Sequence, residues 1–122
     1  MIIGVLKEEK EFEARVAATP ETVKKLVKLD QEIWVEKNAG ISSFINDQDY
    51  VDAGAKIVAR DKVLAADLIL QVQAMNLQDI NNLQSKQYIV GLLDPYNKEL
   101  KASIIAKKIS AFALELLPRN SR

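Results

Sequence analysis

Short apolar runs rich in branched side chains recur along the chain and are separated by polar stretches. Several of them, such as "DLILQV" and "YIVGLL", are apolar at consecutive positions, so both faces of an extended segment would be apolar. This pattern is typical of strands buried in a parallel sheet. The predicted strands cover residues 2–6, 32–36, 56–58, 67–72, 88–93 and 110–116.

The segment after the first predicted strand has the signature of a capped helix. Thr19 is suited to the N-cap and Pro20 to the first helical position. Val23, Leu26 and Val27 follow at helical spacing and form one apolar stripe. The sequence therefore predicts a helix that starts at Pro20 and packs through this stripe.

Further helices alternate with the remaining strands. The second predicted helix starts at Asn46, with Asp49 as a capping-box partner, and ends at Gly54. Two more are predicted over residues 77–83 and 97–107. This alternation predicts an α/β fold of three layers, with a Rossmann-like (flavodoxin-like) parallel sheet, right-handed crossovers and helices on both faces.

Composition narrows the class of protein. A chain of 122 residues that is 48% hydrophobic suits one domain over residues 1–122. Because 17 basic residues balance 17 acidic ones, no nucleic-acid partner is expected. The absence of cysteine and histidine removes thiol nucleophiles, histidine triads and the usual zinc sites, so no catalytic residue and no metal ligand is assigned. No apolar run resembles a signal peptide or membrane span, and a cytoplasmic protein is expected.

Ligands of parallel sheets bind at the carboxyl ends of the strands, where Arg15 lies in the first predicted loop. Its neighbours Glu11 and Glu13 can pair with it at the surface, and the residue types alone favour that interpretation over a functional one.

Motifs of phosphate binding and acid–base catalysis are weak in this chain. Its four glycines are isolated, so it contains no G-x-G-x-x-G turn for a dinucleotide. The paired carboxylates Glu8 and Glu9, and Asp47 and Asp49, are assigned to capping or solvation in preference to catalysis.

Four segments carry a family resemblance: "IGVLKEEKEFEARVAATPETVKKLVKL", "EIWVEKNAG", "DYVDAGAKIV" and "FALELLPRNSR". They resemble the N-terminal domain of the family that unites alanine dehydrogenase with the NAD-binding alpha subunit of proton-translocating NAD(P) transhydrogenase. In that family this segment forms most of one lobe, and the other lobe is a Rossmann domain that carries the glycine-rich turn. The resemblance therefore implies an incomplete lobe that lacks the glycine-rich NAD-binding domain and ends at the interlobe connection.

The resemblance also distinguishes two branches of the family. Alanine dehydrogenases hold pyruvate with an arginine at the position of Arg15, a lysine at that of Gln73 and a histidine at that of Asp94. In this substrate-like cleft only the arginine is retained. A neutral amide supplies no cation and an aspartate repels a carboxylate, so an intact pyruvate site is not expected.

Transhydrogenase alpha subunits end this segment in a "PR-x-(S/T)-R" motif whose first arginine approaches bound NAD(H). The corresponding "PRNSR" makes Arg119, Asn120, Ser121 and Arg122 the implied cofactor-binding residues. The transhydrogenase branch is therefore favoured.

Two departures from the family pattern fall where a glycine is usual. Asp30 follows the first predicted helix and Asn38 follows the second predicted strand. Aspartate in a left-handed conformation costs about 1 kcal/mol relative to glycine, and asparagine tolerates that conformation better than most residues. The fold is expected to survive both.

The resemblance implies a parent protein that binds NAD(H) between its lobes and passes hydride from NADH to NADP. The implied partners are the NAD-binding Rossmann lobe, the NADP-binding and membrane subunits of the transhydrogenase, and a second copy in a homodimer. Through those subunits the protein would lie peripherally at the inner membrane. The chain alone is expected to be inactive and not to bind NAD(H) tightly. Two alternatives remain open: an alanine-dehydrogenase-like oxidoreductase lobe, and a free-standing, non-catalytic interaction module.

Overall fold

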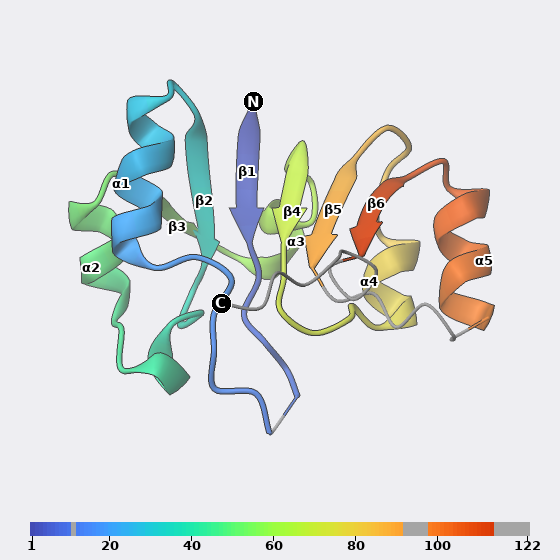
Figure 1. Cartoon of the computed structure of the whole chain (residues 1–122), viewed down its shortest axis with the longest axis horizontal. Coiled ribbons are helices and arrows are strands. Elements are labelled where there is room, and N and C mark those ends of the chain that lie inside the picture. The colour runs from blue at the N-terminus through green and yellow to red at the C-terminus, as the bar shows by residue number, and fades with distance from the viewer. Residues whose placement is uncertain (11, 92–97, 114–122) are drawn as a thin grey trace, which may run out of the picture.

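The computed structural model describes residues 1–10, 12–91 and 98–113. Six parallel strands form one sheet in the order β3-β2-β1-β4-β5-β6 (Figure 1). This is the strand order of the doubly wound Rossmann fold. The chain adds β2 and β3 on one side of β1, and then β4, β5 and β6 on the other side. The predicted α/β class and parallel sheet are confirmed.

All six predicted strands are present, and β1 and β4 are shorter than predicted. They are β1 (Ile2–Val5), β2 (Glu32–Glu36), β3 (Lys56–Val58), β4 (Leu68–Leu70), β5 (Tyr88–Gly91) and β6 (Ser110–Ala113). The predicted extensions over residues 92–93 and 114–116 lie outside the described residues.

The helices include the four that were predicted and two short ones that were not. They are α1 (Pro20–Lys28), the 3-10 helix η1 (Ile41–Ser43), α2 (Asp47–Asp52), α3 (Arg60–Val63), α4 (Leu77–Asn81) and α5 (Lys98–Ala106). The sequence pattern missed η1 and α3 because a segment of three or four residues is too short to show a helical period.

Local capping explains where two helices begin. The Thr19 hydroxyl accepts a hydrogen bond from the Thr22 amide at 3.3 Å at the start of α1. At α2 the Asn46 side chain accepts from the Asp49 amide at 3.2 Å, and the Asp49 carboxylate accepts from the Asn46 amide at 3.3 Å. Both predicted caps are confirmed, and each satisfies backbone donors that the helix itself leaves free.

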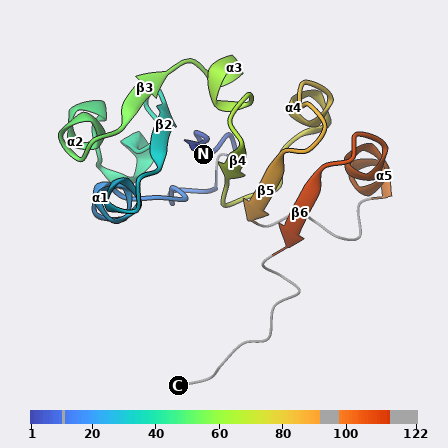
Figure 2. The same cartoon turned by 90° about the horizontal axis from the view of Figure 1, so that it is seen from above.

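Helices cover both faces of the sheet, as the view from above shows (Figure 2). On one face α1 and α2 pack over β1, β2 and β3, and the core there includes Val5, Val23, Val35 and Tyr50. The Tyr50 hydroxyl donates to the Ala18 carbonyl at 2.7 Å, which satisfies it in the core. The second core, under α3, α4 and α5, includes Leu6, Val63, Ile69, Ile80, Ile89 and Leu100.

Gly4 allows close packing on the second face. A Cβ at this position would lie 2.8 Å from Val63 Cγ1 and 3.0 Å from the Ala66 Cβ, so a larger residue would push α3 from the sheet. Trp34 pairs with Gly4 in the neighbouring strand and therefore lies on the same face. It is half-buried there.

Left-handed backbone occurs at both positions where the family pattern favours glycine. Asp30 and Asn38 each have a φ of 64°. The expected conformations are therefore present despite the substitutions.

Half of one sheet face has no helix over it within the described ranges. On the side of α1 and α2, no described helix lies over β4 and β5 (Figure 2). Leu68 and Leu70 of β4 face this side, because they pack against the core under α1 and α2, and their register partners Tyr88 and Val90 in β5 lie on the same face. Tyr88 is 40% exposed, and the other three are partly buried. Within the described residues, this half of the sheet therefore presents partly exposed apolar side chains.

Candidate functional site

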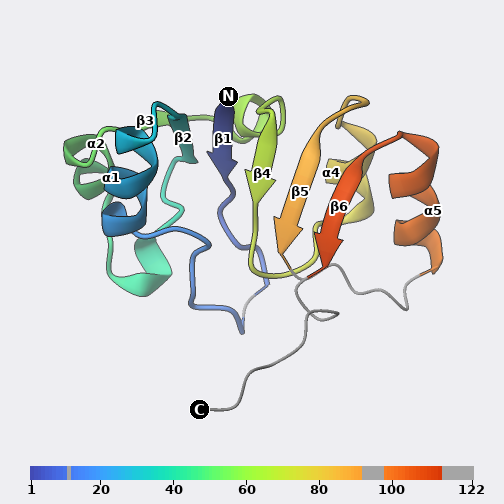
Figure 3. The same cartoon turned by 45° about the horizontal axis from the view of Figure 1, so that its top comes forward.

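The candidate site lies at the carboxyl edge of the sheet. The loop after β1 and the loop between β4 and α4 leave this edge side by side (Figure 3). Arg15 and Gln73, which the sequence analysis singled out, belong to these two loops. The topology therefore brings together two segments about sixty residues apart in sequence.

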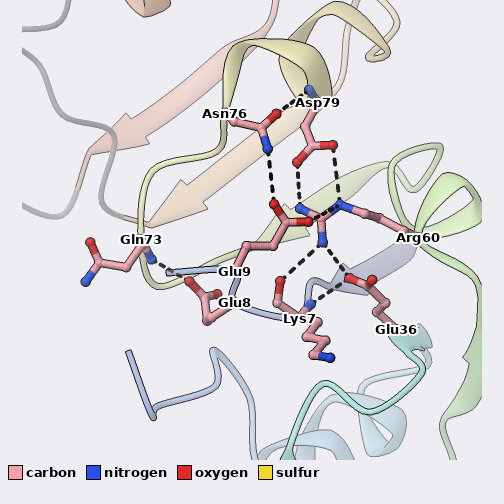
Figure 4. A network of polar contacts seen from close by, with 8 residues as sticks. All are labelled: Lys7, Glu8, Glu9, Glu36, Arg60, Gln73, Asn76 and Asp79. Carbon is pink, nitrogen blue, oxygen red and sulfur yellow. Dashed lines mark hydrogen bonds and ion pairs between the residues drawn. The ribbon is translucent and has the colours of Figure 1, made fainter. Parts of the chain in front are cut away.

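The most connected cation at this edge is Arg60, in the first turn of α3 (Figure 4). Its Nη1 donates to Glu36 Oε1 at 2.7 Å and to the Lys7 carbonyl at 3.2 Å. Its Nη2 lies 2.6 Å from Asp79 Oδ2, and its Nε lies 3.4 Å from Glu9 Oε1. One guanidinium thus joins the ends of β1 and β2 to α3 and α4.

Burial and neighbouring charges have opposite effects on the pKa of Arg60. Burial lowers the pKa of Arg60, but hydrogen bonds to Asp79 and the charges of Glu36 and Glu9 outweigh it, so the pKa is raised. The Arg60 side chain is only 23% exposed, so these charge pairs are less screened by water than surface pairs. The space among Glu8, Arg60 and Asn76 is about 30 Å³, which admits little more than water. We interpret the Arg60 cluster as structural.

Sequence reasoning missed Arg60. The available signal was a single arginine directly after a predicted strand, with Glu36 ending the neighbouring strand. The third partner, Asp79, donates its backbone amide to the side-chain oxygen of Asn76, the N-cap of α4. The Asn76 side-chain amide in turn donates to Glu9 at 3.2 Å. Only the strand order reveals that these groups meet.

Glu8 ties the loop after β1 to the loop after β4. Its Oε2 accepts from the Val72 amide at 2.9 Å and its Oε1 accepts from the Gln73 amide at 2.8 Å (Figure 4). Burial raises the pKa of Glu8, and the two backbone hydrogen bonds oppose that rise only in part. The sequence predicted capping or solvation for Glu8. Its carboxylate binds two backbone amides of a loop and does not cap a helix.

Arg15 and Gln73 converge on one carboxylate, that of Glu13. Arg15 Nε donates to Glu13 Oε2 at 2.9 Å and Arg15 Nη2 donates to Glu13 Oε1 at 2.8 Å. Gln73 Nε2 donates to the same Oε1 at 2.7 Å. Glu13 is buried, with 4% of its side chain exposed, whereas Arg15 is 71% exposed.

The expected pairing of Arg15 with Glu13 is therefore present, and Glu11 lies outside the described residues. The hydrogen bond from Gln73 to the same carboxylate was not predicted, because it joins residues 60 positions apart. Hydrogen bonds from the Arg15 and Gln73 side chains lower the pKa of Glu13 to about 2. The group is a carboxylate throughout the neutral range, and its charge cancels that of Arg15.

A depression of about 380 Å³ lies beside this group. Its lining is mainly apolar, with Arg15 as its charged member; the other lining residues are Val16, Ala17, Leu70, Gln71, Val72 and Val90. The depression joins the carboxyl edge to the uncovered half of the sheet, because Leu70 and Val90 belong to both. An apolar recess with a few polar groups is the usual form of a binding site.

The remaining predicted site residues cannot be placed in this geometry. Asp94, Arg119, Asn120, Ser121 and Arg122 lie outside the described residues, and their roles stay predictions. Among the residues that are described, no three carboxylates lie where they could hold a metal ion.

Comparison with known proteins gives consistent results. The family described as "Alanine dehydrogenase/PNT, N-terminal domain" matches residues 4–122. The NAD(P) transhydrogenase subunit alpha of Haemophilus influenzae is 37% identical over the whole chain, which spans 24% of that protein. Alanine dehydrogenase 1 of Staphylococcus aureus is 34% identical over the whole chain, which spans 33% of it.

A solved structure agrees with the sequence comparisons. The transhydrogenase from Sinorhizobium meliloti superposes with a TM-score of 0.93 at 36% identity, over 99% of this chain and 37% of that one. The chain thus spans about a quarter to a third of the length of the relatives it matches. With a family match over nearly all of its residues, the chain belongs to the alanine dehydrogenase/PNT N-terminal domain family.

Proposed function

We propose that this chain is the N-terminal lobe of the NAD(H)-binding alpha subunit of a proton-translocating NAD(P) transhydrogenase. The observation that carries the proposal is the full-length similarity to transhydrogenases, at 37% identity in sequence and a TM-score of 0.93 in structure. The chemistry of the carboxyl edge agrees, because Arg15 and Gln73 share one carboxylate and together carry no net positive charge. Such a group is poorly suited to hold pyruvate.

In this proposal the lobe acts by shaping a cleft. The described residues contain no glycine-rich phosphate turn, so the pyrophosphate of the dinucleotide is held by the second lobe. Bound NADH supplies the hydride that passes to NADP on another domain. Such a transfer needs no nucleophile or metal from this lobe, and orientation of the two cofactors provides most of the rate.

The residues nearest the cofactor in this proposal are those of the "PRNSR" motif. Arg119 approaches the nicotinamide end, and Asn120, Ser121 and Arg122 accompany it. Arg15 and Gln73 form part of the cleft wall in this proposal, and Glu8 fixes the backbone of Gln73 there.

The uncovered half of the sheet supports the proposed partners. Leu68, Leu70, Tyr88 and Val90 present an apolar surface that the described helices leave open. We propose that the rest of the alpha subunit and a second copy of it supply further contacts, with the NADP-binding and membrane subunits beyond. The longest described helices have nine residues, and no helix in this part of the chain can cross a bilayer.

A pair of chimeras tests the proposed function. In one, this chain replaces the corresponding domain of the Haemophilus influenzae transhydrogenase alpha subunit; in the other, it replaces that of Staphylococcus aureus alanine dehydrogenase 1. We expect the first to reduce an NADP analogue with NADH and the second to lack NADH-dependent amination of pyruvate. Activity in the second chimera alone would establish the dehydrogenase alternative. Two folded but inactive chimeras would favour a non-catalytic interaction module.

The chain by itself provides a further test. Because the lobe holds no phosphate turn in the described residues, we expect calorimetry to show no saturation with NADH at micromolar concentrations. Clear saturation in that range would contradict the assignment of nucleotide binding to another lobe.

A further inference from the structure

The charges of the chain are unevenly distributed along its length. Residues 1–79 contain 14 acidic and ten basic residues, whereas residues 80–108 contain five lysines and only two acidic residues. Helix α5 lies at one end of the long axis of the molecule, and α1 and α2 lie toward the other end (Figure 1). Although the formal net charge is zero, the end that α5 forms is therefore rich in lysine.

Four exposed lysines lie at this end, and we call their side of the molecule the α5 surface: Lys86, Lys98, Lys101 and Lys108. Lys98 and Lys101 lie about one turn apart on α5, and Ile105, which is 67% exposed, follows one turn later on the same side. The Lys86 amide donates to the Lys108 carbonyl at 3.2 Å, so the loops before β5 and β6 bring these two residues together.

The neighbouring helix α4 adds no exposed charge to the α5 surface. Its single charged residue, Asp79, is buried and paired with Arg60. The exposed residues of α4 and its C-cap are uncharged amides: Gln78, Asn81 and Asn82. In α5 itself Glu99 is the one acidic residue, so lysines dominate this surface.

The backbone at two of these lysines supports a function for their side chains. Lys86 has a φ of 71° and Lys108 a φ of 57°, a conformation that glycine adopts more readily than lysine. Lys107, by contrast, has a structural contact, since its Nζ donates to the Asn81 and Leu83 carbonyls at the end of α4. The strain is therefore retained at two exposed cations, which a turn alone does not require.

We propose that the α5 surface binds the anionic surface of a lipid bilayer, with its lysines near the acidic headgroups and Ile105 among them. A basic helix face that also exposes an apolar side chain is typical of peripheral membrane binding. Nucleic acid fits less well, because these cations are lysines and α5 has no aromatic side chain for stacking on bases. The inference goes beyond the proposed function, which places the protein at the membrane only through partner subunits.

Co-sedimentation of the full chain with vesicles tests the inference. The vesicles contain phosphatidylglycerol and phosphatidylcholine in equal parts, and vesicles of phosphatidylcholine alone are the reference. We expect binding to the anionic vesicles only, and we expect added salt to weaken it. No nucleotide or partner subunit is present, so the result is independent of the proposed hydride transfer.

A matched pair of double variants locates the binding surface. Lys98→Gln/Lys101→Gln removes two charges from the α5 surface, and Lys24→Gln/Lys25→Gln removes two from exposed positions of α1. We expect the first variant to bind about thirtyfold more weakly, at about 1 kcal/mol for each lysine near an anionic surface. The α1 variant should bind as the original chain does.

A further variant, Lys86→Gly/Lys108→Gly, separates a binding role from a structural one. Glycine relieves the left-handed backbone at both positions, so this variant should unfold at a higher temperature and yet bind anionic vesicles more weakly. Vesicle binding as tight as that of the original chain would contradict the role of these two lysines. The proposal is also overturned if the original chain does not bind anionic vesicles, if the α1 variant loses as much binding as Lys98→Gln/Lys101→Gln, or if a single-stranded oligonucleotide displaces the chain from the vesicles.

Discussion

Two arginines at the same edge of the sheet are used in opposite ways. Arg60 is 23% exposed and is shared among the carboxylates of Glu9, Glu36 and Asp79. Arg15 is 71% exposed and pairs with one carboxylate, which is itself buried. The Arg60 guanidinium joins the ends of β1 and β2 to α4. The Arg15 guanidinium instead lies in solvent and is bound by the buried carboxylate of Glu13. The exposure of the cation thus distinguishes the structural centre at Arg60 from the solvent-facing group at Arg15.

Removal of the Arg60 charge should have the largest effect on stability. Arg60→Met leaves three carboxylates, two of them largely buried, without their shared cation, and we expect a loss of about 3 kcal/mol in the free energy of unfolding. Urea denaturation measures this loss, provided that the dependence of the free energy of unfolding on urea concentration is unchanged. Arg60→Lys keeps the positive charge but lacks the planar guanidinium, and it should lose less stability than Arg60→Met. A change below about 1 kcal/mol in Arg60→Met would contradict the structural role.

A smaller effect is expected at Glu8, which links the two centres. Glu8→Ala leaves the Val72 and Gln73 amides without their acceptor, and we expect about 1.5 kcal/mol of destabilisation, partly offset because a half-buried charge is also removed. Hydrogen exchange of those two amides should accelerate more than exchange in α1. Unchanged protection of both amides would show that Glu8 does not hold this loop.

Glu13 and Glu8 should make opposite contributions to the pH dependence of stability. The pKa of Glu13 falls from 4.5 to about 2 on folding, so its contribution is present above 4.5 and is lost as the pH falls toward 2. The pKa of Glu8 is raised from 4.5 on folding, so its contribution is full below 4.5 and is lost as the pH rises through the folded-state value.

Unfolding titrations of Glu13→Gln and Glu8→Gln across the acidic range measure these contributions. Relative to the original chain, Glu13→Gln should lose less stability on acidification and Glu8→Gln should lose more. If the stability of both variants changed with pH as that of the original chain does, neither carboxyl would have a different pKa in the folded and unfolded chain.

The smallest effect is expected for Arg15→Met. Its guanidinium is exposed, so the pair with Glu13 is screened by water and salt, and the loss of stability should be several-fold less than for Arg60→Met. Added salt should reduce that loss further while changing the Arg60→Met effect less. An Arg15→Met variant as unstable as Arg60→Met would remove the distinction between the two arginines.

Features set by neighbours in sequence were predictable, and those set by the sheet were not. The caps at Thr19 and at Asn46 with Asp49 involve residues three apart, and both are as expected. The pairing of Arg15 with Glu13 is similarly local.

The contact between Gln73 and Glu13 spans 60 residues, and that between Arg60 and Glu36 spans 24. Both depend on which strands are neighbours. Apolar patterning identifies strands but does not order them, so these groups could not be placed from the sequence. The helix α3, which carries Arg60, is also too short to be recognised by periodicity.

The packing of Trp34 beside Gly4 has an optical consequence. Trp34 is the single tryptophan of the chain, and it lies on the α3 face of the sheet, in a strand whose last residue, Glu36, binds Arg60. Its fluorescence is therefore a built-in reporter of that face, with a wavelength sensitive to the entry of water. Trp34 fluorescence can therefore show whether α3 leaves the sheet before the rest of the protein unfolds.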